Sequence, residues 1–140
     1  MTKDAIQGTV TPKSGFTLVE MMLIVTLIAI LALIAYPSYQ TNIRKAKRND
    51  AIEALLRIQL AEEKWRVSDT DYATLAELGN PATKEGFYTI TIPVNSATGY
   101  TVKATAVGDQ VNDSVSGTPC SPLQLQVSAG GETKSPAVCW

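Results

Sequence analysis

The chain has 140 residues and a formal net charge of −1, with 12 Lys and Arg against 13 Asp and Glu. This length suits one small domain plus a long apolar segment, and the charge balance does not indicate nucleic acid as a partner. There is no histidine, and two cysteines are too few to complete a tetrahedral zinc site. The composition therefore argues against a bound metal.

Residues 1–15 predict a leader peptide rather than a folded segment. They are polar, contain Gly8 and Pro12, and show no hydrophobic periodicity. An ordinary secretory signal places its small residues after the apolar core. Here the small residue Gly15 precedes the apolar run. Cleavage after Gly15 would therefore leave the apolar run in the mature protein.

From Phe16 to Tyr36 the chain is apolar, and Glu20 is the one residue of this run that carries charge. As a helix the run is roughly 30 Å long, the thickness of the hydrocarbon core of a bilayer. We therefore expect a transmembrane helix over residues 16–37. A charge at mid-membrane costs about 2.5–3.5 kcal/mol, so the Glu20 carboxylate is expected to have a partner.

The helix is predicted to continue beyond the membrane as an amphipathic half over residues 38–67. Pro37 removes one backbone hydrogen bond and is expected to kink or loosen the helix at the junction. Apolar residues then recur at broadly helical spacing as far as Trp65, with charged residues on the remaining faces. One helix from about residue 16 to about residue 67 follows from this pattern.

Residues 68–140 predict the loop and sheet of a globular head. Turn-forming residues dominate 69–86, and alternating β-rich stretches follow over 87–92, 100–106 and 123–127. We predict an α+β fold, in which an antiparallel sheet of three or four strands packs on the amphipathic half of the helix. The expected contacts join Leu55, Ile58 and Trp65 to Tyr88, Ile90 and Ile92, or to the strand residues that alternate with these.

Cys120 and Cys139 are the two cysteines of the chain. An even count in a chain predicted to be exported favours a disulfide. Closing this loop would stabilise the fold by about 3 kcal/mol on the chain-entropy model. Two free thiols in a cytosolic protein are the alternative.

The sequence does not suggest an enzyme or a cofactor. It holds no histidine, no nucleophile elbow and no Gly-rich phosphate loop. The pairs Asp69 with Asp71 and Asp109 with Asp113 are interpreted as loop residues, because neither has the ligand density of a calcium loop.

The stretch from Gly15 to Glu20, GFTLVE, resembles the cleavage and methylation motif of type IV prepilins. In that family a glycine precedes the cut, an aromatic residue follows it, and a glutamate comes four residues later. Pro37 stands where pilins carry a helix-loosening proline. Three further segments are similar to the helix end, the loop and the C-terminal disulfide of minor type IV pilins: Glu62–Trp65, Asp71–Gly79, and Cys120 with Cys139–Trp140.

The resemblance implies a structural subunit of a type IV pilus, most like a minor pilin that acts in assembly or priming. A prepilin peptidase would cut between Gly15 and Phe16 and methylate the new Phe16 amine. The prepilin would cross the inner membrane once, with its leader in the cytoplasm and its head in the periplasm. An inner-membrane assembly platform would then pass it to an extracellular filament of major and minor pilins, for motility, adhesion or DNA uptake.

This reading gives Glu20 a partner. Cleavage creates a cationic amine on Phe16, and methylation leaves it cationic. Two unit charges about 4 Å apart attract by about 4 kcal/mol at an effective dielectric constant of about 20. Other registers would leave both charges buried and unpaired. We expect Glu20 of one subunit to pair with the Phe16 amine of its neighbour.

A basic cluster of Arg44, Lys45, Lys47 and Arg48 follows the apolar run. By the positive-inside rule it favours a cytoplasmic head, whereas the leader pattern and the cysteines favour a periplasmic one. Two interpretations of the cluster stay open. One is contact with anionic lipid headgroups before assembly, or with acidic residues of neighbouring subunits later. The other is a solvated helix face with partners three or four residues away.

Two alternative functions share the N-terminal features. A pseudopilin of a type II secretion system has the same motif and helix, although the terminal cysteines favour a pilin. A DNA-binding competence pilin requires an exposed basic patch on its head. Residues 68–140 hold only Lys84, Lys103 and Lys134 as bases, so the sequence argues against strong binding of nucleic acid.

Overall fold

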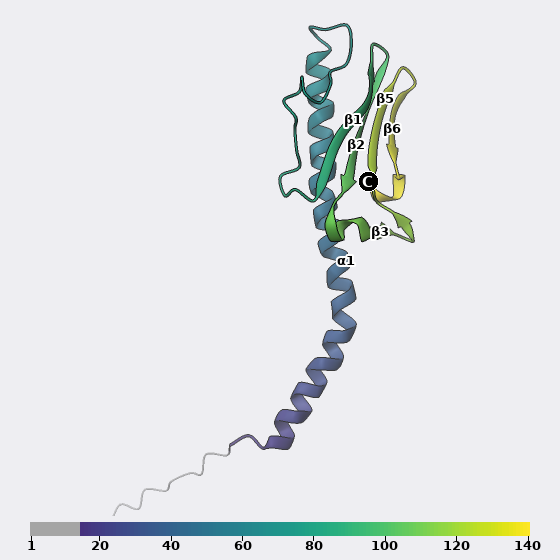
Figure 1. Cartoon of the computed structure of the whole chain (residues 1–140). Helices are drawn as coiled ribbons and strands as arrows, with labels where there is room; N and C mark the ends of the chain where they lie inside the picture. Colours follow the sequence, from purple (N-terminus) through teal and green to yellow (C-terminus); the bar gives the residue numbers. More distant parts are fainter. Residues whose placement is uncertain (1–14) are drawn as a thin grey trace, which may run out of the picture. The chain divides into compact units, whose positions relative to one another are not determined.

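The computed structural model describes residues 15–140, so the predicted leader lies, except for Gly15, outside the described residues. The described chain holds one long helix, α1 (Leu18–Trp65), which precedes all of its strands (Figure 1). It divides into a first unit that ends at Pro37 and a second unit, Ser38–Trp140. The second unit is called the head below.

Helix α1 begins at a residue that caps it. The Thr17 hydroxyl accepts a hydrogen bond from the backbone N–H of Glu20 at 3.2 Å, and the Thr17 carbonyl accepts one from Met21 at 3.2 Å. Thr17 therefore stands at the N-cap and Glu20 at the third helical position, the spacing of a capping box. The Glu20 carboxylate also lies near the helix end where the macrodipole favours negative charge.

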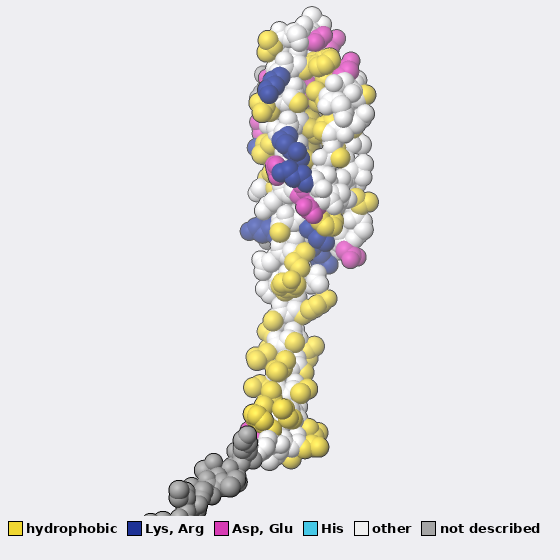
Figure 2. All heavy atoms as spheres, turned by 90° about the vertical axis from the view of Figure 1, so that its left-hand side faces the viewer, with side chains coloured by type: hydrophobic (Ala, Val, Ile, Leu, Met, Phe, Trp, Pro, Cys, Tyr) yellow, Lys and Arg dark blue, Asp and Glu magenta, His cyan; other side chains and the backbone are white. Residues whose placement is uncertain are grey.

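The bounds of α1 confirm the predicted single helix to within two residues at each end, and Pro37 lies inside it. All residues from 18 to 36 are exposed, and Figure 2 shows this segment as a nearly continuous array of hydrophobic side chains. It is long and apolar enough to cross a membrane, with a mean hydropathy of 2.8 over its most apolar part. A helix that is apolar all round suits lipid or other helices rather than water.

The head contains an antiparallel sheet of four strands in the order β1-β2-β5-β6. Their bounds are β1 (Tyr88–Ser96), β2 (Gly99–Ala106), β5 (Leu123–Ser128) and β6 (Gly131–Ser135). The first three confirm the predicted strands: β1 begins one residue later and ends four residues later than predicted, and β2 and β5 are each one residue longer. The fourth, β6, contains no apolar side chain and all five of its residues are exposed, so apolar alternation could not locate it.

The connection between β2 and β5 carries the smaller elements of the head. They are the 3₁₀ helix η1 (Gly108–Asn112) and a hairpin of β3 (Ser114–Val115) and β4 (Thr118–Pro119). A second 3₁₀ helix, η2 (Ala137–Cys139), follows β6. Cys120 and Cys139 form the predicted disulfide, with their Cα atoms 5.6 Å apart and both residues buried.

The core of the head lies between α1 and one face of the sheet (Figure 1). Leu55 and Ile58 are buried there together with Tyr88 and Ile90, which confirms the predicted pairing of faces. The other buried apolar members are Ala51, Ala54, Tyr100, Val102, Ala104, Ala106, Leu123 and Leu125. Trp65 is different: it is half-buried and lies outside this buried cluster, because α1 ends at this residue.

Candidate functional site

The residues of the N-terminal motif lie together at the exposed start of α1. Gly15, Phe16 and Thr17 precede the helix without regular structure, and Phe16 is 72% exposed. These three residues and Glu20 line one shallow hollow. The bond between Gly15 and Phe16 is therefore accessible, and the Glu20 carboxylate belongs to the same corner of the molecule.

The capping role of Thr17 is a feature that the sequence analysis missed. The signal was present in the sequence, because Thr17-Leu18-Val19-Glu20 has the form of a capping box. The cap uses the backbone N–H of Glu20 and not its carboxylate. The predicted pairing of Glu20 with the Phe16 amine of a neighbouring subunit stays a prediction.

The basic cluster at residues 44–48 does not form the solvated helix face that was one of its two interpretations. Arg48 is buried and forms an ion pair with the buried Asp113, with Nη1 and Oδ2 3.0 Å apart. Arg44 is half-buried and donates to the carbonyl of Asn112 at 3.4 Å. The ammonium of Lys47 lies 4.1 Å from the centre of the Phe87 ring.

These partners come from the loop before β1 and from η1 and its end, so the local interpretation is wrong for three of the four bases. The physical reason is that α1 lies against these segments, which replaces helix-neighbour partners with distant ones. Lys45 remains exposed. Of the paired aspartates, Asp113 serves the ion pair with Arg48, while Asp109 lies exposed in η1.

A buried amide fixes η1 to α1 beside this ion pair. The Gln110 side-chain nitrogen donates to the Arg44 carbonyl at 3.0 Å and to the Tyr88 hydroxyl at 2.9 Å. Burial of the Tyr88 phenol raises its pKa, because the charged form is disfavoured away from water. Gln110 therefore joins the helix, the sheet and the β2–β5 connection in one buried network.

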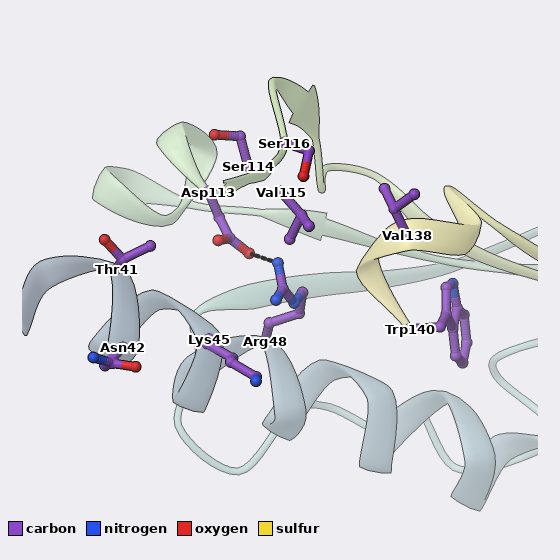
Figure 3. Close-up of a pocket in the computed structure, with 10 residues that line it drawn as sticks. All are labelled: Thr41, Asn42, Lys45, Arg48, Asp113, Ser114, Val115, Ser116, Val138 and Trp140. Carbon is purple, nitrogen blue, oxygen red and sulfur yellow. Dashed lines mark hydrogen bonds and ion pairs between the residues drawn. The ribbon is translucent and has the colours of Figure 1, made fainter. Parts of the chain in front are cut away.

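A hollow of about 400 Å³ opens next to the Arg48–Asp113 pair (Figure 3). We call it the foot hollow. Its lining comes from α1, from the β3–β4 hairpin with the residue before it, and from the C-terminal segment: Thr41, Asn42, Lys45, Arg48, Asp113, Ser114, Val115, Ser116, Val138 and Trp140. Figure 3 shows Arg48 rising from α1 toward Asp113, with Ser114, Val115 and Ser116 on the hairpin side and Val138 and Trp140 on the other.

Glu62 occupies a position that the sequence pattern did not reveal. It was assigned to a polar face of the helix, yet it is fully buried. One carboxylate oxygen accepts the backbone N–H of Ala73 at 2.8 Å, and the other has no partner among the described residues. Burial raises the pKa of Glu62, and the bond from Ala73 opposes this shift in part. Glu62 ties the loop after α1 to the helix.

Two segments of the chain match known protein families. Residues 37–124 match the family described as type IV minor pilin ComP, DNA uptake sequence receptor. Residues 11–36 match the prokaryotic N-terminal methylation motif. The second match covers the segment in which Gly15, Phe16 and Glu20 lie.

Individual relatives agree with these matches. The chain is 28% identical over 114 residues to type IV major pilin protein PilE1 of Neisseria gonorrhoeae, covering 76% of this chain and 66% of that protein. It is 27% identical over 114 residues to a fimbrial protein of Neisseria meningitidis, with coverages of 76% and 63%. Prepilin peptidase-dependent protein D of Escherichia coli is 41% identical over 49 residues, with coverages of 35% and 34%.

The chain thus spans less than two thirds of the length of each of these relatives. Its head nevertheless carries the helix, the antiparallel sheet and the terminal disulfide that the sequence resemblance implied. Because the minor-pilin family model matches more than half of the chain and the methylation motif adjoins it, the chain belongs to the family of type IV minor pilins.

Proposed function

We propose that the chain is a minor structural subunit of a type IV pilus, held in the inner membrane until it is assembled. The observation that carries this proposal is an accessible Gly15–Phe16 bond directly ahead of a helix whose residues 18 to 36 are all exposed. Such a helix leaves its apolar side chains exposed in the described chain. Lipid before assembly and the helices of other pilins afterwards supply the cover that it needs.

Processing at Gly15 changes the electrostatics of the helix start. The new Phe16 amine is a cation near the N-terminus of α1, where the macrodipole disfavours positive charge. A carboxylate from a neighbouring subunit offsets this when the helices bundle away from water. Glu20 therefore sets the axial register of the subunit in the filament, because other registers bury both charges unpaired.

The test compares Glu20→Ala with Thr17→Ala in cells that make the filament. Thr17→Ala removes the hydroxyl that caps α1, whereas Glu20→Ala keeps the capped backbone N–H and removes the carboxylate. We expect both prepilins to be cut, and we expect Glu20→Ala alone to be lost from sheared filaments, by at least about tenfold if the pair contributes more than about 1.4 kcal/mol. Immunoblots of membranes and sheared pili report both steps. Wild-type incorporation of Glu20→Ala would overturn the register role, and equal loss of both variants would assign the loss to a weakened start of α1 rather than to an intersubunit ion pair.

The orientation proposed for the membrane-held subunit places the head in the periplasm. The buried Cys120–Cys139 disulfide supports this, because such bonds persist in oxidising compartments. A prepilin peptidase, an assembly platform, and major and minor pilins are the partners that follow from the proposal. A pseudopilin of a secretion system remains an alternative.

Reception of DNA is a second candidate function. The observation that favours it is the match of residues 37–124 to a family described as a DNA uptake sequence receptor. In the head, acidic partners offset part of the exposed basic charge, since Lys84 and Arg57 both pair with Glu53.

A further inference from the structure

We propose that the foot hollow binds the phosphate of an anionic phospholipid headgroup while the subunit waits in the membrane. This inference rests on the proposed function, because it requires the first unit to be embedded in a bilayer. It assigns a ligand to residues to which the proposed function gives no role.

Arg48 has donors left over after its ion pair is made. Its Nη1 donates to Asp113 at 3.0 Å and approaches the Cys120 sulfur at 2.9 Å. Within residues 15–140, Nε and Nη2 make no hydrogen bond, and neither atom is fully buried. Arg48 lines the foot hollow although its side chain is only 7% exposed, so a ligand in the hollow can reach these donors. A planar guanidinium with free N–H groups suits the oxygens of a phosphate.

The surroundings of Arg48 add charge and hydroxyl donors. Lys45 is exposed and lines the same hollow, as do Ser114 and Ser116 on the opposite hairpin. Among the side chains that line the hollow, Lys45 and Arg48 carry two positive charges against the one negative charge of Asp113, so these side chains together carry a net positive charge. Asp113 fixes the position of the Arg48 guanidinium and offsets one positive charge. The positive charge of Lys45 is then left without a counter-charge among the side chains that line the hollow.

The far wall of the hollow is apolar and aromatic. Val138 and the half-buried Trp140 form it (Figure 3). The Trp140 indole N–H donates to the Ser135 carbonyl at 3.4 Å. Tryptophan is enriched at the level of lipid headgroups, where its ring is apolar and its N–H is satisfied. A wall of this kind suits the glycerol and upper acyl part of a lipid and gives no advantage to free phosphate.

Chain connectivity keeps the foot hollow close to the bilayer. Thr41, on its rim, comes five residues after Tyr36, the last residue of the apolar run. Five residues span about 7.5 Å of α-helix and at most roughly 17 Å of extended chain. The headgroup layer therefore lies within reach for any arrangement of the two units.

The test uses the full chain with Trp65→Phe, which leaves Trp140 as the one tryptophan, in nanodiscs with increasing fractions of phosphatidylglycerol in phosphatidylcholine. We expect Trp140 emission to change saturably with phosphatidylglycerol and not with phosphatidylcholine alone. Lys45→Gln in this background should shift half-saturation to an about fivefold higher fraction of phosphatidylglycerol, the effect of one base at an anionic surface. Lys64→Gln removes the same charge from an exposed position at the C-terminal end of α1. It should leave the dependence of Trp140 emission on phosphatidylglycerol unchanged.

Three outcomes would overturn the proposal. The first is Trp140 emission that does not change with phosphatidylglycerol, and the second is an equal shift of half-saturation by Lys45→Gln and Lys64→Gln. The third is an equal change of emission in phosphatidylcholine discs when inorganic phosphate or pilin heads are added. The last would assign the hollow to free phosphate or to a neighbouring subunit. If Trp65→Phe does not fold, the Trp140 indole N–H signal in nuclear magnetic resonance spectra replaces the emission. Because this assay reads the unassembled subunit, it can fail while the Glu20 experiment succeeds, and the reverse.

Discussion

At the scale of single residues, the two buried acids of the head behave differently. Asp113 meets the cation of Arg48, whereas Glu62 meets only the N–H of Ala73. A buried carboxylate without a cation is disfavoured in its charged form, so the pKa of Glu62 rises above its ordinary value of 4.5. The fold therefore holds a proton on Glu62 more tightly than the unfolded chain does.

The raised pKa of Glu62 makes the stability of the head depend on pH. Between the ordinary pKa of Glu62 and its raised value, the folded state binds more protons, so stability falls as pH rises through this window. Glu62→Gln keeps an acceptor for Ala73 and cannot ionise. We expect it to flatten the pH dependence and to stabilise the head by about 1 kcal/mol at neutral pH. Urea unfolding of the detergent-solubilised chain from about pH 4 to about pH 8 measures this.

The exposed Glu85 provides the matched control, because its charge is not among those that shift the pKa of Glu62. Glu85→Gln removes the same charge without changing a buried group, so its stability profile should follow that of the wild type. A Glu62→Gln profile parallel to the wild type would contradict the assignment of the pH dependence to Glu62.

At the scale of elements, the Cys120–Cys139 disulfide links two segments in the C-terminal part of the head. The disulfide connects the segment after β4 to η2, which follows the exposed edge strand β6. Along β6, Glu132 pairs with Lys134 at 2.8 Å and accepts from Gln59 of α1 at 2.8 Å. Charged side chains of this kind protect an open sheet edge from pairing with other chains.

We predict that Cys120→Ala with Cys139→Ala lowers the free energy of unfolding by about 3 kcal/mol, because the sequence separation of 19 sets the entropy of the closed loop. Urea unfolding of the full chain in detergent measures the loss. Wild-type protein unfolded with and without reductant is the control, and the reduced wild type should approach the double variant. Coincident curves for the oxidised wild type and the double variant would contradict the stabilising role of the bond.

At the scale of the whole molecule, charge is segregated along the chain. The first unit presents apolar side chains, and Figure 2 shows Lys and Arg scattered among Asp and Glu on one face of the head. Several of these bases have partners: Lys84 and Arg57 share Glu53, and Lys47 lies on Phe87. Part of the positive field that would attract a polyanion is thus neutralised.

We therefore expect the full chain to bind duplex DNA weakly and with a shallow dependence on salt, because few phosphates are neutralised. In gel shifts at several salt concentrations, each phosphate neutralised contributes about −0.9 to the slope of log K against log salt. Glu53→Gln frees Lys84 and Arg57 and should strengthen any binding on that face, while Glu63→Gln is the control for net charge. Tight, sequence-dependent binding by the wild type would instead favour the second candidate function.

The sequence alone predicted the elements whose signals are local. An apolar run long enough for a bilayer indicated the first half of α1, residue alternation indicated three strands, and two cysteines allowed one intramolecular pairing. The N-terminal motif also predicted the family, because the order of Gly15, Phe16 and Glu20 is itself the signal. The Thr17 cap was readable in the same stretch and was missed.

Only the tertiary structure decided which polar residues are buried and what they meet. Arg48 and Asp113 are 65 positions apart, and Glu62 meets Ala73 across the turn that ends α1. Helical periodicity treats such residues as surface, because it records spacing along one element and not what lies against it. The foot hollow likewise exists because α1, the β3–β4 hairpin and the C-terminal segment converge there. Contacts between distant segments depend on how the elements pack, which no local pattern in the sequence records.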